Sequence, residues 1–214
     1  MPEQASEAIV LRTYPLRESD LIVSFFTRDQ GKLRGVAHRA RRPKGGFGSS
    51  LERLSHVRIR YAARENQELV RVNGCDLMQS QFALAADYRC GVALDVMAEI
   101  AEYLLPPHET NERFYRLLLS VLEFLRQSGG EGVWQAVTYF EWWAVRLSGF
   151  LPELRLSEAA QQLETQIRTT PIAALATGDC QRAETAELRR RLGALIEAHI
   201  ERRLLAAPLL EGIE

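Results

Sequence analysis

Residues 54–61, Leu54-Ser-His-Val-Arg-Ile-Arg-Tyr61, alternate apolar and polar side chains more regularly than any other stretch of the chain. Successive side chains of a β-strand point to opposite faces, so one set would enter a core and the other would face outward. The inward set is Val57, Ile59 and Tyr61, and the outward set is His56, Arg58 and Arg60. This stretch therefore predicts a half-buried strand with a basic outer face.

Four further short runs rich in β-branched and aromatic residues lie in the first 80 residues, separated by turn residues such as Pro15. The predicted strands are Glu7–Thr13, Asp20–Thr27, Gly31–Ala37, Leu54–Tyr61 and Glu68–Val72. Five short strands in a segment of this size indicate a small barrel, and the oligonucleotide-binding (OB) fold has this strand number.

Beyond Gln79 the apolar residues recur with the 3.6-residue period of amphipathic helices. The predicted helices are Phe82–Leu105, Asn111–Gln127, Val133–Leu147, Ser157–Gln166 and Thr185–Leu205. The third is aromatic and apolar on nearly every side, so it should be the central helix. The fold class is therefore α+β, with a five-stranded OB-fold barrel over residues 1–80 and an all-α domain over residues 81–214.

The chain has 27 Lys and Arg against 28 Asp and Glu, but the two signs are unevenly distributed. Residues 1–80 hold 14 basic and 9 acidic residues, a net of +5, whereas the remainder holds 13 and 19, a net of −6. A positive region that is cancelled elsewhere in the chain is typical of a protein that binds a polyanion at one place.

The richest basic segment is the loop His38-Arg-Ala-Arg-Arg-Pro-Lys-Gly-Gly-Phe-Gly-Ser-Ser50, within a region, residues 28–60, that carries ten Lys and Arg against two acids. Such side chains neutralise phosphates, and an aromatic ring exposed in the loop, Phe47, would stack on an unpaired base. The alternative interpretation is a solvated loop whose charges only keep the domain soluble. The candidate DNA-binding residues are Arg34, His38, Arg39, Arg41, Arg42, Lys44, Phe47, His56, Arg58 and Arg60.

Other classes of protein find little support in the sequence. The apolar runs are shorter than the roughly 18 residues of a membrane span, and the N-terminus lacks the basic start of a secretory signal. Cys75, Cys90 and Cys180 show no C-x-x-C spacing, so we expect free thiols in the cytoplasm, no metal and no cofactor. No phosphate loop, nucleophile elbow or H-E-x-x-H motif supports an enzyme.

Several segments of the first 62 residues stand in a distinctive order and spacing: Glu7-Ala-Ile-Val-Leu-Arg12, Glu18-Ser-Asp-Leu-Ile-Val23, Phe26-Thr-Arg28, Gly31, Val36-Ala37, Arg41-Arg-Pro-Lys44 and Leu51-Glu52. Together they resemble the N-terminal domain of the RecO family of bacterial recombination mediators. The resemblance is strong over residues 7–62, and the Leu147-Ser-Gly-Phe-Leu-Pro152 segment after the aromatic helix also fits.

The resemblance implies a nucleoid-associated DNA-repair protein that binds single- and double-stranded DNA and anneals complementary strands. It also implies two protein partners, RecR and the C-terminal tail of single-strand DNA-binding protein (SSB), and indirect action on RecA. The family's basic strand and loop positions fall on Arg34, Arg39, Arg41, Arg42 and Lys44. For the SSB tail, the candidate residues are Arg113, Arg116 and Arg126 on the second helix, although ordinary exposed arginines are an equally good interpretation.

The sequence departs from many members in one respect. Those relatives carry a four-cysteine zinc motif after the aromatic helix, whereas Cys180 is the only cysteine between residues 151 and 180 here, so we expect no zinc. Two other functions stay open: an RNA-binding module, since OB barrels accept RNA as well as DNA, and an interaction scaffold in which the helical domain is the working surface.

Overall fold

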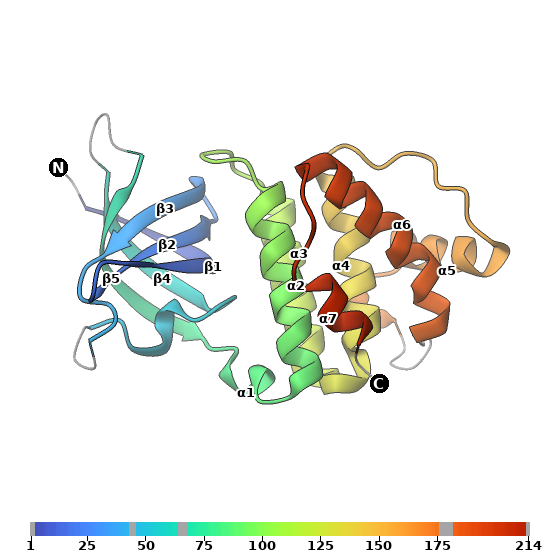
Figure 1. The fold of residues 1–214 in the computed structure, drawn as a ribbon, viewed down its shortest axis with the longest axis horizontal. Helices are drawn as coiled ribbons and strands as arrows, with labels where there is room; N and C mark the ends of the chain where they lie inside the picture. The colour runs from blue at the N-terminus through green and yellow to red at the C-terminus, as the bar shows by residue number, and fades with distance from the viewer. Residues whose placement is uncertain (1–2, 43–45, 64–67, 176–181, 213–214) are drawn as a thin grey trace. The chain divides into compact units, whose positions relative to one another are not determined.

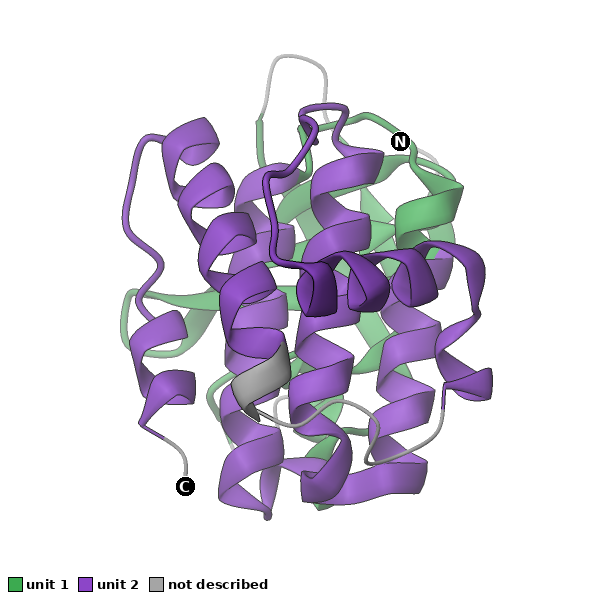
Figure 2. Cartoon of the chain, turned by 90° about the vertical axis from the view of Figure 1, so that its right-hand side faces the viewer, with its two compact units in different colours: residues 1–83, 105–115 green, residues 84–104, 116–214 purple. Residues whose placement is uncertain are grey.

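The computed structural model describes residues 3–42, 46–63, 68–175 and 182–212, with the side chains of residues 182–184 excluded (Figure 1). Its contacts divide the chain into two compact units, shown in Figure 2. The barrel unit comprises Met1–Ala83 and Leu105–Tyr115, and the helical unit comprises Leu84–Leu104 and Arg116–Glu214. The segment 105–115, which the sequence assigned to the helical domain, thus clusters with the barrel.

Five strands close into a barrel in the order β1-β2-β3-β5-β4. The strands are β1 (Gln4–Leu16), β2 (Asp20–Thr27), β3 (Gly31–Ala37), β4 (His56–Ala62) and β5 (Val70–Gln79). Only β3 and β5 pair in parallel, and all other neighbours are antiparallel. This closed order confirms the predicted OB-fold barrel, with β1 and β5 longer than their alternation indicated.

The barrel interior is filled by alternate residues of all five strands. The inward set predicted for β4 is confirmed, because Val57, Ile59 and Tyr61 are all at most 1% exposed. The rings of Phe25 and Tyr61 lie 5.9 Å apart in this core. The connection from β3 to β4, which contains the short 3-10 helix η1 (Gly48–Leu51), adds Leu51 to the same cluster.

The segment 105–115 covers part of the outer face of the barrel. The Phe26 ring packs edge-on against Phe114, with 6.2 Å between ring centroids, and the backbone N–H of His108 donates to the carbonyl of Lys32. Gly31 has φ of 73°, and a Cβ there would lie 2.3 Å from the carbonyl oxygen of Glu109, so the close approach requires glycine.

The helices are α1 (Phe82–Ala85), α2 (Tyr88–Leu104), α3 (Glu112–Ser128), α4 (Val133–Leu147), α5 (Glu158–Thr169), α6 (Arg182–Ile200) and α7 (Ala207–Glu211), with 3-10 turns η2 (Gly129–Gly132) and η3 (Ile172–Ala174). In the helical unit α4 packs against both α2 and α6, as expected of a central helix, and its Phe140 and Trp142 are fully buried. Within the part of the chain that the structure describes, no helix is long and apolar enough to cross a bilayer.

Two helix predictions were wrong at their ends. The predicted helix 82–105 is two helices, because the Asp87 carboxylate accepts the backbone N–H of Cys90 and so begins α2 anew. The predicted helix 185–205 ends at Ile200, since Glu201 has φ of 54°, and a separate helix, α7, follows.

Candidate nucleic-acid interface

Two rows of outward side chains cross β1, β2 and β3. Residues directly opposite each other in antiparallel strands share one face of the sheet. One row is Arg12, Ser24 and Arg34, of which Ser24 is fully buried, and the next is Tyr14, Ile22 and Val36. The second row continues onto β5 through Arg71, which is exposed beside Val36. The outer face of β1, β2 and β3 thus combines cations, an aromatic ring and small apolar groups.

Two guanidinium groups lie close to the Tyr14 ring on this face. The Arg12 Cζ atom is 5.2 Å from the centroid of the Tyr14 ring, and the Arg34 Cζ atom is 6.0 Å from it. These separations are within the range of cation–π attraction. We call Arg12, Tyr14 and Arg34 the Tyr14 cluster. Of these three, only Arg34 was predicted from the sequence. Tyr14 lies beyond the predicted end of the first strand at Thr13, and Arg12 lies outside the basic region of residues 28–60 from which the candidates came.

The basic loop after β3 is held by a carboxylate at the start of β2. Oδ1 of Asp20 accepts the backbone N–H of Arg39 at 2.8 Å, and its Oδ2 lies 2.9 Å from Nδ1 of His38. The Arg39 hydrogen bond first, and then the His38 ring, lower the pKa of the Asp20 carboxyl group. Because Arg39 has φ of 56°, the chain turns sharply here, so Asp20 fixes the turn from which the loop leaves the barrel.

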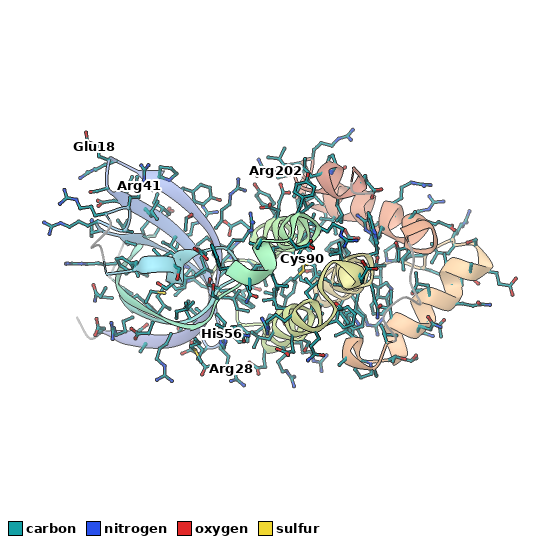
Figure 3. The ribbon with its side chains drawn as sticks, turned by 90° about the horizontal axis from the view of Figure 1, so that it is seen from below. Glu18, Arg28, Arg41, His56, Cys90 and Arg202 are labelled. Carbon is teal, nitrogen blue, oxygen red and sulfur yellow. The ribbon has the colours of Figure 1, made fainter. Side chains whose placement is uncertain are left out.

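Arg41 and Arg42 follow this turn and are both exposed. The backbone N–H of Arg41 donates to the carbonyl of Ser19, which ties the loop to the connection between β1 and β2. Figure 3 shows Arg41 and Glu18 at one edge of the barrel and Arg28 and His56 at the opposite edge. Lys44 lies outside the described residues.

The basic row of β4 is also exposed, as its alternation predicted, but acids surround it. Arg60 forms an ion pair with Asp76 of β5 at 3.3 Å, and Arg58 lies between Glu7 of β1 and Asp76 in the strand register. Moreover, β5 separates β4 from β3 in the barrel order. The cations of β4 therefore do not form one continuous surface with Arg34, contrary to the expectation of a single basic flank.

Two of the aromatic candidates are less accessible than the sequence predicted. Phe47 is 8% exposed and belongs to the barrel core, so the expectation of an exposed stacking ring was wrong. Burying an aromatic ring under an open barrel end is favourable, and the glycines on both sides let the chain turn inward. The His56 side chain is 15% exposed and lies against Tyr115, with 6.2 Å between ring centroids, so it is not part of an open basic face.

Comparison with known proteins relates both units to one family. A family model described as "Recombination protein O N terminal" matches residues 1–81, and one described as "Recombination protein O C terminal" matches residues 86–160. A protein of Koribacter versatilis named "DNA repair protein RecO" is 37% identical over 243 aligned positions, which cover 98% of each chain. The chain belongs to the RecO family.

Other RecO proteins match over shorter stretches. The protein from Cutibacterium acnes is 34% identical over 72% of this chain and 64% of its own length. The protein from Geobacter metallireducens is 35% identical over 59% of this chain and 51% of its own length. The resemblance inferred from the sequence is thus confirmed, and with it membership of a family of DNA-repair proteins with an OB-fold barrel.

The three arginines suggested by the RecO resemblance for an SSB tail do not converge. Arg113 and Arg116 are exposed on adjacent turns of α3, but Arg126 lies ten residues beyond Arg116, about 15 Å along the helix axis and about 80° around it. Arg126 is also paired with Glu123 at 2.7 Å. A single peptide carboxylate could therefore not contact both Arg116 and Arg126.

The cysteines of this RecO chain offer little reactivity. Burial raises the pKa of Cys90 to about 11 and raises the pKa of Cys75, so both thiols stay protonated near neutral pH. Cys180 lies outside the described residues. Within the described ranges, no group of three or more His, Cys, Asp and Glu side chains is arranged to hold a metal ion. The barrel face carries cations and an aromatic ring, side chains of the types that neutralise phosphates and stack on bases.

Proposed function

We propose that this RecO-family chain is a non-enzymatic DNA-binding mediator that anneals complementary single strands and helps to load RecA onto SSB-coated DNA. The observation that carries the proposal is the Tyr14 cluster beside the exposed loop arginines. Two guanidinium groups lie within 6.0 Å of the centroid of an aromatic ring on the outer face of β1–β3, and Arg41 and Arg42 are exposed on the loop that follows β3.

This arrangement suits single-stranded DNA. Lys and Arg neutralise phosphates without reading sequence, and an aromatic ring stacks on any base because every base has a π-face. Annealing brings together two polyanions that repel each other, so cations on both the strand face and the loop would lower that repulsion. Base pairing then supplies the sequence specificity, and no reacting group of the protein is required.

In this proposal the loop cations contribute more to DNA binding than the cations of the β4 row. A matched pair of variants tests this difference. Arg41→Ala with Arg42→Ala removes two exposed loop cations, and Arg58→Ala with Arg60→Ala removes two cations that face Asp76. Both variants lose the same charge. For single strands, each lost phosphate contact reduces the slope of log K against log salt concentration by about 0.7. The slope should therefore fall by up to about 1.4 in the loop variant and by clearly less in the β4 variant.

The measurement is fluorescence anisotropy with a labelled oligonucleotide over a salt series, together with an annealing assay with and without SSB on the strands. Equal losses of DNA affinity in the two variants would mean that the loop contributes no more than the β4 row. Unchanged DNA affinity in both variants would contradict DNA binding by the barrel. A matched RNA competitor separates DNA binding from the RNA-binding alternative. RecR and the SSB tail are the expected protein partners, in a cytoplasmic, nucleoid-associated protein.

A further inference from the structure

His38 follows the last residue of β3 and faces the first residue of β2. Leu21 lies opposite Ala37 in the antiparallel pair of β2 and β3, so the same register places His38 opposite Asp20. Strand residues two positions apart share one face of a sheet. The pair therefore continues the outer face of the barrel, in the row next to that of Tyr14.

The contact with Asp20 determines which ring nitrogen carries the proton when His38 is neutral. Oδ1 of Asp20 accepts the backbone N–H of Arg39 at 2.8 Å, and Oδ2 lies 2.9 Å from Nδ1 of His38. The Arg39 hydrogen bond first, and then that of the His38 ring, lower the pKa of the Asp20 carboxyl group. Asp20 is thus ionised near neutral pH, and an ionised carboxylate only accepts hydrogen bonds. Nδ1 is therefore the donor, and Nε2 of the neutral ring has no proton.

The state of the ring decides whether Nε2 repels or binds a phosphate. The side chain of His38 is 55% exposed, whereas that of Asp20 is 12% exposed, so a ligand can reach the ring while the carboxylate stays covered. A neutral Nε2 accepts hydrogen bonds, as phosphate oxygens do, so the two do not bind each other. Protonation turns Nε2 into a charged donor, and Nδ1 keeps its bond to Asp20.

We propose that His38, held by Asp20, is a proton-dependent phosphate contact of the barrel face, so that the chain takes up a proton at this ring when it binds a single strand. The inference rests on the proposed function, because its ligand is the phosphate chain of DNA. His38 makes the contact, and Asp20 is a positioning residue that sets the tautomer. A phosphate beside the ring favours its charged form, so DNA affinity should rise as the pH falls through the range in which histidine titrates.

The other charged groups on the elements around His38 are of types that do not titrate in this range. They are Asp20 of β2, Arg17 and Glu18 of the turn between β1 and β2, Arg71 of β5, and Arg39, Arg41 and Arg42 of the loop. Arginine keeps its charge and acidic side chains lose their proton below about pH 5, whereas histidine changes its charge between about pH 5 and 8. A pH dependence that disappears together with the imidazole therefore comes from this ring.

The test is fluorescence anisotropy of the full chain with a labelled single strand, at one salt concentration and at about pH 5.5 and about pH 8. The parent chain should bind about two- to fivefold more tightly at the lower pH, which is the range for one solvent-exposed ion pair. His38→Gln stays neutral and should lose this increase. His38→Lys stays charged and should bind with the higher affinity at both pH values. His199→Gln, which removes an exposed histidine from α6, is the matched control and should keep the increase.

Two further measurements report on the ring directly. Calorimetry in buffers of different ionisation enthalpy should show that DNA binding takes up a proton in the parent chain and not in His38→Gln. Nitrogen NMR of the chain without DNA should show the neutral His38 ring with its proton on Nδ1. Asp20→Asn should weaken this preference, and an unchanged tautomer in that variant would contradict the positioning role of Asp20.

The inference fails if His38→Gln keeps the pH dependence of the parent chain, or if neutral His38 carries its proton on Nε2 in the chain without DNA. Both results leave DNA binding by the barrel standing. A parent chain that binds no single strand at either pH would instead overturn the proposed function, and this inference with it.

Discussion

Replacing Tyr14 tests whether the aromatic ring of the barrel face stacks on a base. In Tyr14→Ala the two flanking guanidinium groups remain, so phosphate neutralisation is kept while the stacking surface is lost. Stacking of one base on an aromatic ring contributes about 1–3 kcal/mol. Tyr14 is half-buried, so the lower part of that range applies, and single-strand affinity should fall about 5- to 30-fold at roughly 1.4 kcal/mol per tenfold.

The assay is anisotropy with a single-stranded oligonucleotide of about 15 nucleotides, near the upper site size of one OB fold, and with a duplex of the same length. A duplex offers no free base faces, so Tyr14→Ala should change its affinity much less. Tyr14→Phe keeps the ring and should bind single strands like the parent chain. Tyr88→Ala, which removes a tyrosine that is 68% exposed on α2, is the matched control.

The reasoning is refuted if Tyr14→Ala weakens single-strand and duplex binding equally, or if Tyr14→Phe is as weak as Tyr14→Ala. The first result would mean that the ring only positions Arg12 and Arg34. The second would mean that the hydroxyl group, rather than the ring, makes the contact.

Three further results are expected. Phe47→Ala should lower the free energy of unfolding, measured by denaturant titration, by about 3–5 kcal/mol. A variant that loses affinity for single strands but keeps its stability would contradict the place of the Phe47 ring in the core. Asp20→Asn should speed hydrogen exchange at the Arg39 amide. Because the pKa of Asp20 is lowered in the folded state, its stabilising effect is present at neutral pH and is lost as pH falls through that pKa. Burial raises the pKa of Glu141 to about 7 from 4.5. The free energy of unfolding of the parent chain, relative to that of Glu141→Gln, should therefore fall as the pH rises between these two values. A difference in unfolding free energy that stays constant over this pH range would contradict the prediction.

The barrel was predictable because its strands carry strong local signals. The expected bounds of β2 and β3 match the structure, and the alternation of β4 correctly separates its buried and exposed sides. Strand pairing depends on contacts between distant residues, which no local pattern contains. The sequence therefore missed that β1 continues through Pro15 to Leu16, where Pro15 faces Leu21 of β2, and so it missed Tyr14 as part of the site.

The unexpected positions of Phe47 and of the segment 105–115 have a common cause. In both cases an aromatic side chain covers apolar surface that only the closed barrel creates: Phe47 comes from a glycine-rich loop and Phe114 from the first turn of α3. Phe47 lies between glycines, which indicates a turn, but its ring is buried in the core of the barrel. Likewise, the surface that Phe26 presents forms only when β2 joins the barrel, and Phe114 packs against its ring, which is fully buried. Local composition contains no information on such surfaces.

Ion pairing makes some of the basic residues less available to a phosphate than others, although a count of basic residues treats them alike. Of the ten between residues 28 and 60, several are occupied or enclosed within the barrel unit: Arg28 is paired with Glu112 at 3.0 Å, Arg60 with Asp76 at 3.3 Å, and Lys32 is 7% exposed. A cation that already has a carboxylate must give it up to bind a phosphate, which offsets much of the gain. Arg41 and Arg42 are exposed beyond the turn that Asp20 fixes. The surface that we propose for a polyanion thus depends on where the acids of β1, β5 and α3 lie, and a substitution that removes an acid, such as Asp76→Asn, should make the β4 row available to DNA without adding a positively charged group.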